Sequence, residues 1–154
     1  MPPYFVAFLD ELKRLEQDSS TWQFADDRQR PTLTLEAQHP CVGPLVIYDE
    51  GEELTLEFGT KYHCHFDGFE SETHEADRML GAAILAAGYV NRILCKRIGV
   101  AVHFNDRCCT GASLIYLDDC GLSAENLEES TAGIFGGTIR TERFLWTGPI
   151  KNPT

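Results

Sequence analysis

Residues 54–66 read LTLEFGTKYHCHF, with apolar and polar side chains alternating on either side of Gly59. A two-residue loop at Gly59 and Thr60 would pair Leu56 with His63, and each face of the hairpin would then mix apolar and polar residues. A loop of residues 59–61 instead makes one face apolar throughout, because it pairs Phe58 with Tyr62, Leu56 with Cys64 and Leu54 with Phe66. The sequence therefore predicts a hairpin in this register, and Gly59 supplies the unusual backbone geometry of its turn more easily than Lys61 does.

The same register makes the opposite face of the hairpin polar. It brings together three pairs of side chains: Glu57 with His63, Thr55 with His65, and Glu53 with Asp67. A preceding hairpin, whose turn is Asp49-Glu50-Gly51-Glu52, places Val46 and Tyr48 on this face as well. We expect the face to point away from the hydrophobic core, so that its histidines and carboxylates can reach a ligand or partner.

The interpretation we favour for this face is a partner-binding surface. Exposed tyrosine and histidine beside carboxylates suit protein recognition. The candidate binding residues are Tyr48, Glu57, His63, His65 and Asp67.

Two chemical alternatives remain open at the same place. Neutral imidazoles two residues apart could hold a divalent metal together with a carboxylate. The candidate ligands are His63, His65 and Asp67, with His74 and His103 as further candidates for the third position. Glu57 and His63 could also act as an acid–base pair, and the simpler interpretation is a solvated cross-strand pair. No cofactor other than this metal is implied.

The rest of the chain predicts an α+β fold, with a mainly antiparallel sheet packed against a long central helix. Helical spacing of apolar residues indicates an N-terminal helix over residues 3–17 and the long helix over 72–95. The predicted strands surround Trp22 and Phe24, Leu33 and Leu35, and residues 45–48, 53–58, 98–104, 112–117 and 138–146. A short helix is expected from Ser123.

The long helix is predicted to bury one stripe and leave small residues on its remaining surface. The stripe consists of Ala76, Leu80, Ala83, Ile84, Ala87, Val90 and Leu94. Gly81, Ala82, Ala86 and Gly88 would then lie outside it, where another chain could pack closely. Self-association through this surface is one expectation, and the oligomeric state stays open.

Composition places the chain among globular proteins and excludes two classes of partner. Its 154 residues predict a single domain, 1–154, and 13 Lys and Arg against 24 Asp and Glu give a formal net charge of −11. Nucleic acid and anionic membrane surfaces repel such a chain. Asp10 and Glu11 interrupt any export signal, so we expect a cytoplasmic protein whose six cysteines are thiols.

Two segments resemble small bacterial cytosolic proteins of the immunity type, which are associated with polymorphic or contact-dependent toxins. The first is residues 58–67, FGTKYHCHFD, followed by a helix. The second is residues 139–148, IRTERFLWTG, which resembles a closing strand of the form Arg-x-x-x-Trp-x-Gly but with one residue fewer between Arg143 and Trp146. The resemblance implies a stoichiometric inhibitor that blocks a toxin by binding it.

Together these observations favour a non-catalytic, acidic binding protein whose partner is a basic toxin. The negative net charge agrees with this independently, because complementary charge speeds the capture of a basic protein. A metal-dependent enzyme that uses His63, His65 and an acidic residue is the first alternative. A self-associating structural or regulatory subunit is the second.

Overall fold

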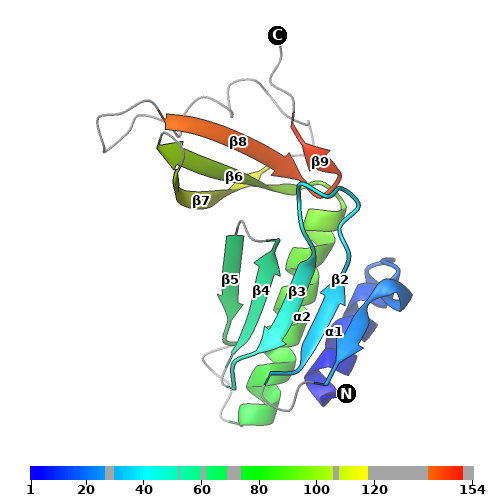
Figure 1. Ribbon diagram of the computed structural model, residues 1–154. Coiled ribbons are helices and arrows are strands. Elements are labelled where there is room, and N and C mark those ends of the chain that lie inside the picture. The colour runs from blue at the N-terminus through cyan, green and yellow to red at the C-terminus, as the bar shows by residue number, and fades with distance from the viewer. Residues whose placement is uncertain are drawn as a thin grey trace.

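The computed structural model describes residues 1–26, 30–51, 53–59, 62–68, 74–105, 108–117 and 139–150. Within them the chain forms two α-helices, one 3-10 helix and two antiparallel sheets (Figure 1), which confirms the predicted α+β class. The elements are α1 (Pro3–Arg14), η1 (Ser19–Thr21), β1 (Gln23–Ala25), β2 (Thr32–Leu35), β3 (Leu45–Asp49), β4 (Leu54–Phe58), β5 (Tyr62–Phe66), α2 (Glu75–Leu94), β6 (Ile98–Asn105), β7 (Cys108–Tyr116), β8 (Ile139–Leu145) and β9 (Gly148–Pro149).

The first five strands form sheet A, a meander in the order β1-β2-β3-β4-β5. The register predicted for the β4–β5 hairpin is confirmed, since Leu56 pairs with Cys64 and Glu57 pairs with His63. Gly59 takes the left-handed backbone conformation, with φ at +57°, as the turn requires. Its N–H donates to the carbonyl oxygen of Pro44 over 2.7 Å, which ties this turn to the segment leading into β3.

The remaining strands form a second sheet, sheet B, in the order β7-β6-β8-β9. It lies across the upper end of α2 in Figure 1, whereas sheet A lies along the length of that helix. The predicted strands are therefore present, but they divide between two sheets. Trp146, in the turn between β8 and β9, joins the sheets because it is 2% exposed and its ring centroid lies 6.0 Å from that of Phe58 in β4.

α1 is shorter than predicted. It ends at Arg14 rather than at residue 17, because Glu16 adopts a positive φ of 61° that a right-handed helix cannot accommodate. Phe5, Phe8 and Leu12 are fully buried on one side of the helix. On the same side of sheet A, the Tyr4 hydroxyl donates to the carboxylate of Asp49 in β3. This hydrogen bond links the first turn of α1 to the sheet.

The buried side of α2 agrees with the predicted stripe at Ala83, Ala87 and Val90 but not at Leu80 and Ile84. Leu80 and Ile84 are 37% and 46% exposed, whereas the neighbouring alanines are fully buried, at positions 82, 83, 86 and 87. Alanine has no side chain beyond Cβ, so this side of α2 can approach sheet A and α1 closely. Ala82 and Ala86, predicted to be available to another chain, are therefore used inside this one.

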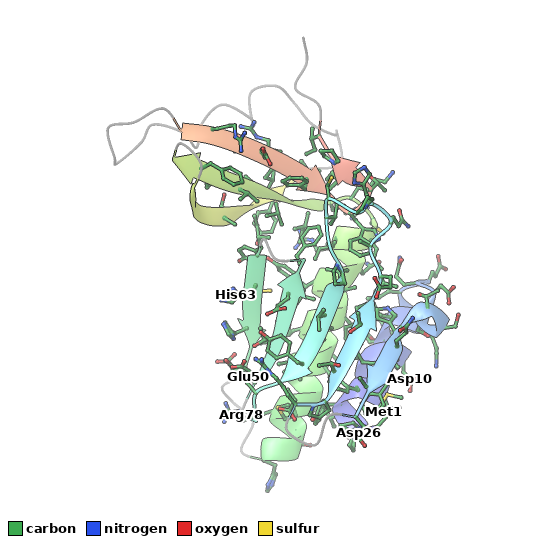
Figure 2. The ribbon with its side chains drawn as sticks, viewed as in Figure 1. Met1, Asp10, Asp26, Glu50, His63 and Arg78 are labelled. Atoms are coloured by element: carbon green, nitrogen blue, oxygen red, sulfur yellow. The ribbon has the colours of Figure 1, made fainter. Side chains whose placement is uncertain are left out.

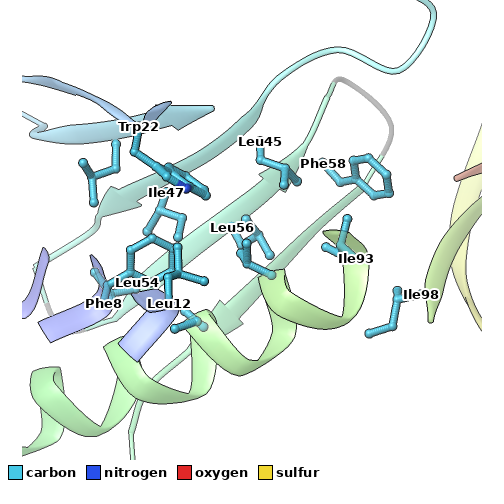
Figure 3. Close-up of a cluster of buried hydrophobic side chains, with 14 of the residues drawn as sticks. Phe8, Leu12, Trp22, Leu45, Ile47, Leu54, Leu56, Phe58, Ile93 and Ile98 are labelled. Atoms are coloured by element: carbon cyan, nitrogen blue, oxygen red, sulfur yellow. The ribbon is translucent and has the colours of Figure 1, made fainter. Parts of the chain in front are cut away.

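One hydrophobic cluster joins both helices to the two sheets (Figure 3). Phe8 packs edge-on against Trp22, with ring centroids 5.1 Å apart. The indole Nε1 of Trp22 is buried and has no hydrogen-bond partner among the described residues. The core therefore uses this side chain for its apolar area.

Two predictions concern residues that the structure does not describe. The short helix predicted from Ser123 lies outside the described residues. Cys120, one of the six predicted thiols, lies outside them as well. No helix in the part of the chain that the structure describes has the length and apolar character needed to cross a bilayer.

Gly59→Ala tests the constraint at the turn between β4 and β5. A Cβ at this position would lie 1.9 Å from the carbonyl oxygen of Val42, and the backbone would remain in the left-handed region. We expect the free energy of unfolding to fall by about 2 kcal/mol or more in urea denaturation.

Gly51→Ala is the matched control. Gly51 also has a positive φ, but no atom lies within 4 Å of the point that a Cβ would occupy there. It should lose only about 1 kcal/mol, the cost of the backbone conformation. Equal losses for the two variants would show that Gly59 does not depend on its close approach to Val42.

Candidate functional site

The candidate site lies on the side of sheet A that faces away from α1 and α2, which we call the open face. Strand pairing arranges its side chains in two rows that cross the sheet. One row is Ala25, Thr32, Tyr48, Thr55 and His65, and the other is Gln23, Thr34, Val46, Glu57 and His63. Figure 2 shows His63 of β5 at the outer edge of the sheet. Glu50, which follows β3, lies near the lower end of the sheet in the same view.

Tyr48 occupies the middle of the first row and is held from two sides. Its hydroxyl donates to Glu57 Oε1 over 2.9 Å. The guanidinium carbon of Arg30 lies 3.5 Å above its ring centroid, which is a cation–π arrangement. Burial raises the pKa of the Tyr48 hydroxyl, and the bond to Glu57 adds to this effect. The phenol therefore remains a hydrogen-bond donor at neutral pH.

His65 ends the same row and is positioned by two oxygens. Its Nδ1 lies 2.9 Å from the hydroxyl oxygen of Thr55 and 2.8 Å from Glu53 Oε1. A carboxylate can only accept, so the contact with Glu53 requires a proton on Nδ1. Thr55 is fully buried beneath this arrangement. The ring of His63 meets that of His65 edge to face, with centroids 5.3 Å apart.

The predicted residues are thus brought to one face, but their partners differ in part from expectation. Glu57 and His63 are opposite one another in the strand register. However, the carboxylate of Glu57 accepts its hydrogen bond from Tyr48. The acid–base pair of Glu57 and His63 has no supporting side-chain contact among the described residues. Asp67 follows β5 directly and is exposed.

The groups that could hold a metal are not the predicted three. In the described chain the ligand atoms of Glu50, Glu53 and His65 all lie within 4.8 Å of one another. His63 and Asp67 do not belong to this group. His103 lies in sheet B, where its Nδ1 is 3.2 Å from Thr141 Oγ1 and its Nε2 is 3.1 Å from Ser113 Oγ.

Two residues of the site were missed from sequence. Arg30 covers Tyr48 and also forms an ion pair with Glu50. The sequence does place Glu50 in the predicted turn that joins the strands of Tyr48 and Thr55. That position could have identified Glu50 as a neighbour of the site. Arg30 gave no such signal, because its approach depends on how the chain enters β2.

Comparison of the chain with protein-family models, with curated proteins and with solved structures found no match. The candidate site is therefore defined by its own geometry. It is a polar sheet face that offers two exposed imidazoles and several carboxylates. The expectation that Tyr48 is exposed is wrong: the side chain is 8% exposed beneath Arg30, and its hydroxyl is hydrogen-bonded to Glu57.

Alkylation of the Cys64 thiol tests which side of β5 faces the core. Burial raises the pKa of its thiol to about 12, so the thiolate that reacts with alkylating agents is scarce near neutral pH. With iodoacetamide at about pH 8, we expect Cys64 to stay largely unmodified in the folded protein, as measured by peptide mass spectrometry.

Cys41 is the control, because it is exposed and should be alkylated readily. After denaturation both cysteines should react at similar rates. Rapid alkylation of Cys64 in the folded protein would contradict the assigned orientation of β5 and, with it, the open face.

Proposed function

We propose that the chain is a binding protein that captures a basic protein through the open face of sheet A. The observation that carries this proposal is the mutual fixing of the site's side chains. Tyr48 is held by Arg30 and Glu57, and His65 is held by Thr55 and Glu53. Side chains that are already ordered lose less conformational entropy when a partner binds.

Charge supports a basic partner. The formal net charge is −11, and Glu50, Glu53, Glu57 and Asp67 lie on or beside the open face. A negatively charged surface attracts a positively charged protein over several ångströms and raises its association rate. Arg30 is a cation on this face, but its charge is paired with Glu50.

Within this proposal, an inhibitor of the immunity type is the specific function we favour. The described part of residues 58–67, which resemble that group, comprises the last residue of β4, Gly59, all of β5 and Asp67. They carry His63 and His65 into the open face. A toxin with a basic surface would be neutralised by stoichiometric binding, with no chemistry required of the inhibitor.

Glu57→Gln tests the proposal by removing charge while preserving the hydrogen bond from Tyr48. Where a basic toxin is encoded beside the gene for this chain, that toxin is the probe, purified and mixed with the variant. We expect the association rate constant, measured by stopped-flow fluorescence at low salt, to fall by about three- to tenfold. Added salt should reduce the difference from the unmodified protein.

Asp10→Asn is the control, because it removes the same charge from α1, on the opposite side of sheet A. Its association rate should remain close to that of the unmodified protein. Equal slowing in both variants would mean that overall charge, and not this face, guides binding. A gene neighbourhood without a toxin would remove the immunity-type function from the proposal.

A metal-dependent function is the second candidate, favoured by the grouping of Glu50, Glu53 and His65. One imidazole and two carboxylates suit a zinc ion with an open coordination position. Arg30 would have to leave Glu50 before that carboxylate could bind a cation.

Zinc titration by calorimetry separates this candidate from the first. If the group binds zinc, His65→Ala should lower the affinity at least about tenfold. His63→Ala should leave the affinity unchanged, although both variants remove one exposed imidazole. Zinc binding that survives His65→Ala, or that is absent from the unmodified protein, would end the metal-dependent alternative.

A further inference from the structure

A cleft of about 510 Å³ lies where the last turn of α2, the end of β2 and the β8–β9 turn come together. This size is within the range of pockets that enclose small molecules. Its described lining shares Gln23 with the open face but includes none of the residues assigned to partner binding. The cleft therefore borders that face, and its chemistry can be considered separately.

Three apolar side chains form one part of the lining. Leu35 ends β2, Leu94 ends α2, and Trp146 comes from the β8–β9 turn. The indole of Trp146 is held by its ring contact with Phe58. These side chains come from three segments far apart in sequence, so the apolar wall exists only in the folded chain.

Polar side chains from η1 and the residue before it, from Gln23 in β1, and from the segment after β2 form the other part. Asp18 and Glu36 contribute carboxylates, and Gln38 contributes an amide. The Oδ1 of Asp18 accepts from the backbone N–H of Ser20 over 2.9 Å and from its hydroxyl over 2.6 Å. These hydrogen bonds lower the pKa of Asp18, so the group is ionised at neutral pH, and its Oδ2 can accept from a ligand.

Gln17 adds an acceptor whose orientation is set by α2. Its Nε2 donates to Asn91 Oδ1 over 2.8 Å. Because the amide nitrogen is held in this way, the carbonyl oxygen of Gln17 can accept from a ligand. The described lining thus combines acceptors and two negative charges with an apolar wall, and it contains no lysine or arginine.

We propose that this cleft binds an organic cation, namely an alkylguanidinium or alkylammonium group. Its carbon chain would pack on Leu35, Leu94 and Trp146. Its charged head would donate to Asp18 and Glu36. An anion would be repelled by these carboxylates, and a wholly apolar ligand would cover them without replacing their hydrogen bonds to water.

Butylguanidinium is the probe, and its neutral isostere N-butylurea is the matched ligand. Trp146 reports binding through its fluorescence once the other tryptophan is changed by Trp22→Phe. This substitution keeps a ring against Phe8 and removes an indole N–H that has no partner in the described chain. We expect saturable binding of butylguanidinium and at least about tenfold weaker binding of butylurea.

The double variant Asp18→Asn with Glu36→Gln should weaken butylguanidinium binding at least about tenfold. Asparagine at position 18 can still accept from Ser20 and begin η1. The control is Asp10→Asn with Glu142→Gln, which removes the same charge outside the cleft and should leave binding unchanged. Should Trp22→Phe fail to fold, the indole ¹H–¹⁵N signal of Trp146 in the otherwise unmodified protein provides the same titration.

The absence of saturable binding, equal binding of butylurea, or equal weakening in both double variants would overturn the proposal. The titration uses the purified chain alone, so its result does not depend on the partner of the open face. A lysine or arginine side chain of that partner has the same chemistry as the free cation. Displacement of the partner by butylguanidinium would identify the side chain as the occupant, and binding without displacement would identify a free small molecule.

Discussion

The pairing of Leu56 with Cys64 governs which side chains of sheet A reach the core and which reach the solvent. Side chains alternate along a strand, so a slip of one residue would move His63 and His65 toward α2 and turn Tyr62 and Phe66 outward. Such a slip would also bring a residue with a side chain to the position of Gly59, where the backbone of Val42 leaves no space for a Cβ. The polar face and the hydrophobic core are therefore two results of one register.

The packing of α2 connects sheet A to α1 and to sheet B. Fully buried alanines at positions 82, 83, 86 and 87 let the helix lie close to both sheet A and α1. Its far end continues into β6, which places sheet B across the end of the helix. Trp146 then closes the junction against Phe58. The same junction creates the cleft lined by Leu94 and Trp146, so the cleft follows from how the two sheets are joined.

Local patterns were sufficient to predict the strands, the β4–β5 register and the placement of Tyr48, Glu57, His63 and His65 on one face. Each of these depends on residues close in sequence. The division into two sheets could not be predicted, because it depends on long-range contacts such as that of Trp146 with Phe58. Leu80 and Ile84 were misplaced because apolar periodicity identifies hydrophobic residues but not the side on which alanine permits closer packing. Arg30 was missed because its position over Tyr48 is set by tertiary structure.

The position of α1 has a consequence for synthesis on the ribosome. This helix is translated before α2, but its buried side chains pack in the same cluster as those of α2. Gln17, just beyond α1, reaches Asn91 across 74 positions of sequence. Phe5, Phe8 and Leu12 must therefore stay without their final neighbours until α2 has been translated. During that interval the apolar side of α1 is exposed on the nascent chain. Exposed apolar surface of this kind is what chaperones bind.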